Sequence, residues 1–121
     1  MIFISDYDGT LSHGSIQKGA ISQQDLQAIA RFRAAGHTFG IATGRALDYM
    51  RADLARFDLN PDFIIGANGG IALMDGKEHR YSVFTPEALT AFALELQALP
   101  GMRMVFCDAY TYTTPIFLDD L

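Results

Sequence analysis

The 121-residue sequence has little of what marks several large classes of protein. Its one cysteine, Cys107, excludes an internal disulfide framework and a cysteine-based zinc cluster. No uninterrupted hydrophobic run exceeds four residues, far below the roughly 20 that a membrane-spanning helix needs. The first residues, 1–4, include no basic segment and lead into Asp6, so a secretory signal peptide is not expected there. These absences predict a cytoplasmic protein.

Basic residues are also scarce, with nine Lys and Arg against 14 Asp and Glu and a net charge of −5. The bases are scattered singly along the chain, whereas a surface that binds nucleic acid normally clusters them. A nucleic acid is therefore not an expected partner. A small anionic ligand is still compatible with the composition, because a bound metal or a helix N-terminus can reverse the charge locally.

Half of the residues are hydrophobic, which is typical of a chain with a packed core. Short apolar segments typical of buried strands alternate with segments whose apolar residues recur at helical spacing. The expected strands are residues 2–5, 38–42 and 63–66, and the expected helices run from Ser22 to about Gly36 and from Leu47 to about Phe57. This β-α-β-α-β order predicts parallel strands joined by right-handed crossovers.

The pattern changes after Gly70. Residues 71–74 and 81–84, around a turn at 75–77, predict a β-hairpin. A helix from Thr85 to about Leu99 and a strand at 103–112 are expected to follow. We therefore expect two units, a parallel α/β unit in residues 1–70 and an antiparallel α+β unit in residues 71–121.

Polar residues follow each of the expected parallel strands, at the end where an open sheet binds its ligands. They are Asp6, Asp8 and Thr10 after the first strand, Thr43, Gly44 and Arg45 after the second, and Asn68 after the third. Asp6 and Asp8 can lean toward one cavity, where a hard cation such as Mg²⁺ would relieve their repulsion. Gly9 between Asp8 and Thr10 permits a tight turn and close approach of a ligand. For the carboxylate pair alone, an acidic turn without function is the alternative.

The strand followed by Asp6-Tyr7-Asp8-Gly9-Thr10 resembles the first motif of the haloacid dehalogenase superfamily. Residues 41–45, Ile-Ala-Thr-Gly-Arg, are similar to the second motif, and with residues 65–70 they resemble the Cof-type subfamily. The resemblance covers the entire chain. It implies a Rossmann-like, three-layer α/β fold with a parallel sheet, of which residues 1–70 form the first half of the catalytic core. Residues 71–121 would begin a type IIB α+β cap, and the C-terminal half of the family fold is expected to be absent.

The resemblance implies a Mg²⁺-dependent phosphatase of small phosphorylated metabolites, with sugar phosphates as the commonest substrates of the family. Asp6 would be the nucleophile that forms an aspartyl-phosphate, and Asp8 would be the general acid and base. Asp6 and the backbone carbonyl of Asp8 would hold the metal. The implied phosphate-binding and substrate-binding residues are Gly9, Thr10, Thr43, Gly44, Arg45 and Asn68. For Arg45, a solvated position at the start of a helix is the alternative.

The family pattern also needs a Lys or Arg and an acidic turn that completes the Mg²⁺ site. The only lysines are Lys18 and Lys77, neither after a later parallel strand, and Asp119-Asp120 follow no Gly. We therefore expect a truncated family member that pairs with a missing half or a second copy through an exposed sheet edge. A catalytically impaired, phosphate-binding regulatory module is an alternative function. A receiver-like phosphoacceptor domain is a remote one, since the third strand is followed by Asn68 and no acid.

Overall fold

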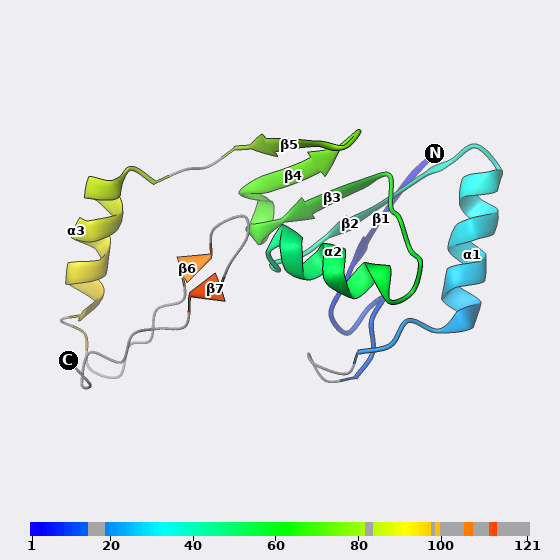
Figure 1. Ribbon diagram of the computed structural model, residues 1–121, viewed down its shortest axis with the longest axis horizontal. Coiled ribbons are helices and arrows are strands. Elements are labelled where there is room, and N and C mark those ends of the chain that lie inside the picture. The colour runs from blue at the N-terminus through cyan, green and yellow to red at the C-terminus, as the bar shows by residue number, and fades with distance from the viewer. Residues whose placement is uncertain (15–18, 82–83, 98, 100–105, 108–111, 114–121) are drawn as a thin grey trace.

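The structure is a computed structural model that describes residues 1–14, 19–81, 84–97, 99, 106–107 and 112–113. Five strands form one sheet in chain order: β1 (Ile2–Asp6), β2 (Thr38–Ala42), β3 (Phe63–Gly66), β4 (Ile71–Met74) and β5 (Lys77–Arg80). The helices are α1 (Gln23–Ala34), α2 (Leu47–Ala55) and α3 (Pro86–Gln97), with a 3₁₀ turn, η1 (Ala67–Gly69), after β3. Figure 1 shows α2 in front of the sheet and α3 beyond its end.

The predicted β-α-β-α-β unit is confirmed. The first three strands are parallel, and their ends are aligned, since Asp6 lies opposite Ala42 and Ala42 opposite Ile65. The helix α1 begins where the capping pattern predicts, because the Ser22 hydroxyl accepts a hydrogen bond from the Asp25 amide at 3.0 Å. None of the described helices is long and apolar enough to cross a membrane.

The hairpin after Gly70 differs from the predicted one in its second strand and in the length of its turn. Its second strand begins at Lys77 and pairs with Met74, so the predicted strand at 81–84 is wrong for the described residues Tyr81 and Phe84. The turn has only the two residues Asp75 and Gly76, whose φ angles of 51° and 72° suit a two-residue hairpin turn. The hairpin also extends the main sheet, because β4 pairs antiparallel with β3.

The sheet is therefore mixed, parallel through β3 and antiparallel from β4 onward. The change in pairing lies at Gly70, as expected, but it occurs within one continuous sheet. The division into a core at residues 1–70 and the start of a cap at 71–121 stays a prediction.

The single strand predicted at 103–112 is wrong for the residues that the structure describes there. Phe106–Cys107 (β6) and Tyr112–Thr113 (β7) form an antiparallel pair, so the chain reverses direction between them. The other residues of that predicted strand lie outside the described residues, as do Lys18 and the acidic pair Asp119-Asp120.

One face of the sheet carries the core. Alternate strand residues on this face are almost fully buried, and they pack with one stripe from each of α1 and α2. The strand residues are Phe39, Ile41, Ile64 and Ile71, and the helix residues are Ile29, Leu47, Met50 and Leu54. Both helices therefore lie on the same side, as right-handed crossovers that advance in one direction across a sheet require. This packing fixes the start of α2 beside the end of β2.

The opposite face is apolar but open. It carries Ile2 and Ile4, which are 66% and 49% exposed, and the half-buried Phe63 and Ile65. The Phe63 ring lies on Gly40, where an added Cβ would be 2.1 Å from the ring. Neither α1 nor α2 reaches this face. The described residues thus supply two layers of the predicted three-layer fold.

Candidate functional site

The three loops that follow the parallel strands meet at one edge of the sheet, as predicted. The Thr43 amide donates to the carbonyl of Ile65 at 2.8 Å, and the Asn68 amide donates to the carbonyl of Thr43 at 3.3 Å. The Ala67 amide donates to the carbonyl of Arg45 at 2.9 Å. These bonds join the end of β2 to the end of β3, beside the loop after β1.

Gly44 lies against the side chain of Asn68. A Cβ at residue 44 would lie 2.9 Å from Oδ1 of Asn68, closer than ordinary side chains approach one another. Asn68 itself has a φ of 53°, a left-handed conformation that asparagine tolerates better than most residues. The third loop therefore places an amide side chain directly over the second loop.

The loop after β1 is held by its own backbone. The carbonyl of Tyr7 accepts hydrogen bonds from the amides of Leu11 and Ser12, at 3.1 and 2.8 Å. Gly9 has a φ of +77°, and its amide donates to the carbonyl of Ser12 at 2.9 Å. A phosphate bound through the Gly9 amide would therefore compete with this hydrogen bond.

Asp6 presents an accessible carboxylate at this edge. Its side chain is exposed, and its Oδ2 accepts a hydrogen bond from the Thr10 hydroxyl at 3.3 Å. Within the described part of the chain, Asp6 forms no ion pair with Lys, Arg or His. Thr10 is thus placed to orient Asp6, and the carboxylate stays open to a ligand from solvent.

Asp8 has a different environment, because Arg45 binds its carboxylate with two hydrogen bonds. Arg45 Nε donates to Asp8 Oδ2 at 2.6 Å, and Nη2 donates to Oδ1. The Asp8 side chain is 48% exposed, whereas that of Arg45 is 10% exposed. The alternative that Arg45 is a solvated residue at the start of a helix is therefore wrong. The two carboxylates, two residues apart, therefore differ in their partners.

Burial of the Arg45 guanidinium is the largest influence on its pKa and acts to lower it, whereas the hydrogen bonds and charge of Asp8 act to raise it. Tyr49 and Asp53 add to the stabilisation, so the pKa of Arg45 is raised above its usual value. The Arg45 backbone amide donates to Oγ1 of Thr43 at 3.2 Å. Thr43 is buried, and its hydroxyl keeps its own proton to donate to a ligand.

Sequence reasoning missed the residues that surround Arg45 on its buried side. The Tyr49 ring centroid lies 4.2 Å from Arg45 Cζ, and the Tyr7 centroid lies 5.3 Å from it. The Tyr7 hydroxyl donates to Oδ2 of Asp53 at 2.6 Å. Burial, and then the hydrogen bond to Asp53, raises the pKa of Tyr7, so its hydroxyl stays a donor. The available signal was Asp53, an acid three positions after Met50 on the buried stripe of α2.

The site fits part of a Mg²⁺ coordination set. The Asp6 carboxylate and the Asp8 carbonyl are hard oxygen donors of the kind that Mg²⁺ prefers. The Asp8 carboxylate is occupied by Arg45. Across the residues that the structure describes, no group of three or more His, Cys, Asp or Glu side chains converges on a metal position. Further ligands would come from water, a bound phosphate or groups outside the described residues.

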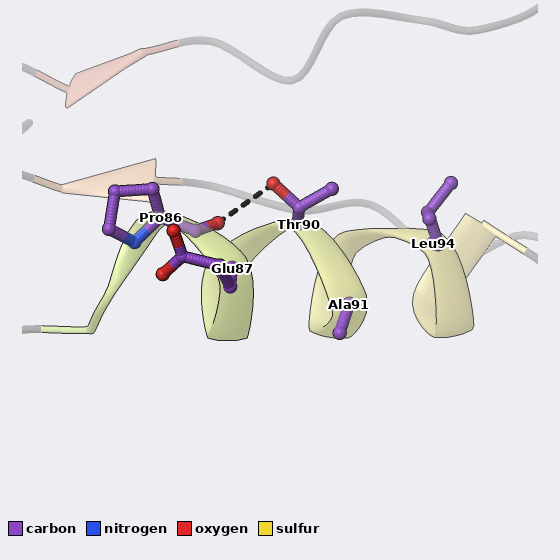
Figure 2. A pocket seen from close by; sticks show the side chains of 5 residues that line it. All are labelled: Pro86, Glu87, Thr90, Ala91 and Leu94. Carbon is purple, nitrogen blue, oxygen red and sulfur yellow. Dashed lines mark hydrogen bonds between the residues drawn. The ribbon is translucent and has the colours of Figure 1, made fainter.

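A shallow hollow lies along one side of α3 (Figure 2), and Figure 1 shows α3 apart from the strand ends. It is lined by Pro86, Glu87, Thr90, Ala91 and Leu94, and the Thr90 hydroxyl donates to the Pro86 carbonyl at 2.8 Å. None of these residues belongs to the strand-end cluster. The hollow is therefore separate from the candidate site.

A carboxylate pair, a threonine and an arginine at the ends of parallel strands are typical of α/β enzymes that act on small anionic substrates. The family model of haloacid dehalogenase-like hydrolases matches residues 3–116 of the sequence. The chain belongs to this family, and the predicted membership is confirmed. A comparison with curated proteins found no match.

Several solved structures share the fold. A hypothetical protein from Geobacillus kaustophilus is 26% identical, with a TM-score of 0.71, over 92% of this chain and 41% of that chain. A haloacid dehalogenase superfamily phosphatase from Bacteroides thetaiotaomicron is 26% identical, with a TM-score of 0.63, over 79% of this chain and 34% of that one. A subclass IIB sugar phosphatase is 24% identical, with a TM-score of 0.67, over 92% and 42%. The chain thus spans less than half the length of each.

Proposed function

We propose that this chain carries the nucleophile and the general acid and base of a Mg²⁺-dependent phosphatase that acts on small phosphorylated metabolites. The observation that supports this most is the contrast between the two carboxylates. Asp6 is exposed and forms no ion pair with the described residues, whereas Asp8 is bound by Arg45. Carboxylates placed in different environments are suited to different roles in one reaction.

In the proposed reaction, a carboxylate oxygen of Asp6 attacks phosphorus and the bond to the leaving oxygen breaks. Asp8, once it has turned away from Arg45 and taken up a proton from solvent, gives that proton to the leaving oxygen, so an alcohol leaves and an aspartyl-phosphate remains. Asp8 then takes a proton from water, whose oxygen attacks phosphorus and releases inorganic phosphate and free Asp6. Arginine only donates hydrogen bonds, so Asp8 has to turn away from Arg45 to transfer a proton.

The surrounding residues would bind the phosphoryl group. The Thr43 hydroxyl keeps its proton, Gly44 and Arg45 follow it on the same loop, and Asn68 lies on the loop after β3. Asp6 and the carbonyl of Asp8 would hold Mg²⁺, which supplies positive charge to the phosphoryl oxygens. Loss of one such preorganised contact costs on the order of 10² to 10³ in rate.

The proposed substrates are small phosphorylated metabolites, with sugar phosphates first among them. One structural neighbour is a sugar phosphatase, and the acidic chain, with its bases scattered singly, does not favour a nucleic acid. A cytoplasmic location agrees with such substrates. The open side of β1 would bind a second polypeptide segment, either a second copy or a chain that corresponds to the rest of the longer relatives.

Binding of beryllofluoride, a mimic of the phosphoryl group, with Mg²⁺ tests the proposed nucleophile. We expect a bound fluorine signal in ¹⁹F NMR spectra of the wild-type chain and its loss in Asp6→Asn. The control is Asp48→Asn, an exposed acid on α2 outside the site, which should keep the signal. Equal binding by the wild type and Asp6→Asn would contradict covalent catalysis.

The second candidate is a phosphate-binding module with impaired catalysis. It is favoured by the absence of any cation paired with Asp6 in the described portion of the chain. Turnover of an aryl phosphate by the same samples separates the two. We expect the isolated chain to bind the mimic but to turn over close to background, whereas turnover near or above about 1 s⁻¹, the low end for enzymes, would contradict impairment. The receiver-like phosphoacceptor domain is no longer a candidate, because the chain belongs to the haloacid dehalogenase-like hydrolase family.

A further inference from the structure

Arg45 lies between two carboxylates. One edge of its guanidinium, Nε and Nη2, binds Asp8. The remaining nitrogen, Nη1, faces Oδ2 of Asp53 at 3.9 Å, which is an ion pair but too long for a hydrogen bond. Nη1 is buried, and among the buried side-chain nitrogen and oxygen atoms of the described residues it is the one without a hydrogen-bond partner. A buried, unpaired donor is costly, so its position beside Asp53 needs a reason.

Asp53 is held firmly from the other side. Its side chain is 7% exposed, Oδ2 accepts the Tyr7 hydroxyl at 2.6 Å, and Oδ1 accepts a hydrogen bond from Arg56. Tyr7 is fully buried and lies between Asp6 and Asp8 in the chain, so Asp53 is linked to the site both through Tyr7 and through Arg45. The proposed reaction uses neither Asp53 nor Tyr7.

We propose that Asp53 is a positioning residue that keeps the Arg45 guanidinium in place when Asp8 turns away to transfer a proton. This rests on the proposed function, in which Asp8 must leave Arg45. Without Asp8, Arg45 would be a buried cation, and a buried cation needs a partner. A small shift brings Nη1 within hydrogen-bond distance of Asp53, while the Tyr7 and Tyr49 rings keep the guanidinium close to its present plane.

A role limited to pairing with Arg56 explains the arrangement less well. The Arg56 side chain is 48% exposed, so water can solvate it without Asp53. The Asp53 carboxylate is almost fully buried, and removing a carboxylate from water is costly unless buried partners repay it. Tyr7 and Arg45 are its buried partners, and both lead to the strand-end site.

The test removes Asp8 and follows Arg45 by NMR of its side-chain nitrogens, without substrate. In Asp8→Asn, we expect the Arg45 Nη protons to stay resolved, because rotation of the guanidinium is still restrained by Asp53. In Asp8→Asn with Asp53→Asn, we expect the resolved signals to be lost to averaging. The matched control is Asp8→Asn with Asp48→Asn, which changes an exposed acid on the same helix and should behave as Asp8→Asn alone.

Free rotation of Arg45 in Asp8→Asn alone would overturn the proposal, as would retained signals in the variant that lacks both acids. If backbone amide spectra show that this variant is unfolded, Asp8→Asn with Tyr7→Phe takes its place, because it removes only the hydroxyl that fixes Asp53. We expect broadened Arg45 signals there, because Tyr7 holds Oδ2, the Asp53 oxygen that faces Arg45, while Arg56 holds the other oxygen; unchanged signals would overturn the proposal. Failure of wild-type beryllofluoride binding would contradict the proposed function and leave these results intact.

Discussion

The two faces of the sheet are similar in composition but differ in what covers them. Ile41 on the covered face is fully buried beneath the helices, whereas Ile4, on the neighbouring strand, faces the opposite way and is 49% exposed. Strands that are apolar on both sides are typical of sheets covered on both faces. The comparison indicates that packing of the helices on the covered face positions the strand-end loops, while the open face has apolar surface that another layer could cover.

The edge formed by β1 belongs to the open region. Among the described strands, β1 pairs only with β2. Its first three residues, Ile2, Phe3 and Ile4, are apolar, and about half or more of each side chain is exposed. An exposed, hydrophobic edge strand is a template for pairing with another chain. The strand that carries Asp6 thus has apolar surface left to bury.

The largest expected effect is on the free energy of unfolding, when the same substitution, Ile to Ala, is made on each face of the sheet. Ile41→Ala leaves a cavity in the covered core, so we expect a loss of about 2 to 5 kcal/mol in the free energy of unfolding. Ile4→Ala removes the same atoms from a half-exposed position, and we expect a loss below about 1 kcal/mol. Urea unfolding followed by circular dichroism measures both. Similar losses for the two variants would show that the open face is buried in solution.

The strands and helices up to β3 were predictable because the information is local. Each element is marked by residues within it or next to it. The strands are short apolar runs, the helices show helical spacing of apolar residues, and Ser22 and the glycine after α1 mark the two ends of that helix. The strand β5 was missed for a physical reason. Its residues, Lys77 to Arg80, are polar on both faces because it is an edge strand with solvent on either side, so no alternation marks it.

Much of the candidate site was also predictable, since the carboxyl ends of parallel strands must meet at one edge. The placement of Asp6, Thr43 and Asn68 at one edge followed from strand order alone. The ion pair between Asp8 and Arg45 did not, because it depends on the directions of two side chains that are 37 residues apart. The contact of Tyr7 with Asp53 likewise exists only once α2 has packed on the sheet.

A smaller effect is expected on self-association through the open side. Ile4→Lys places a charge on the exposed apolar face beside the β1 edge, a change that opposes pairing with another chain. We expect at least tenfold weaker self-association, about 1.4 kcal/mol, in sedimentation experiments. The control is Gln24→Lys, which adds the same charge at an exposed position on α1. Equal association of the two variants would locate the contact elsewhere.

The smallest expected effect concerns the end of the sheet opposite the site. Asp62, just before β3, binds Arg33 of α1 at 2.6 Å and accepts the amide of Phe39 at 2.8 Å. The Arg33 hydrogen bond, and then the Phe39 amide, lowers the pKa of Asp62 from the usual 3.8. A lowered pKa in the folded state means that the stabilisation is complete above 3.8 and is lost as the pH falls through the folded value.

Asp62→Asn keeps an oxygen for the Phe39 amide but removes the ion pair, whose members are both more than one-third exposed. We therefore expect it to lower the free energy of unfolding by less than about 1 kcal/mol at neutral pH. The difference from the wild type should shrink below pH 3.8, because the wild-type carboxylate is then protonated as well. Urea unfolding at several pH values, with Asp58→Asn as an exposed control, measures this difference. If the difference in the free energy of unfolding between the two proteins stays constant down to the lowest pH, the ion pair of Asp62 with Arg33 does not contribute to stability.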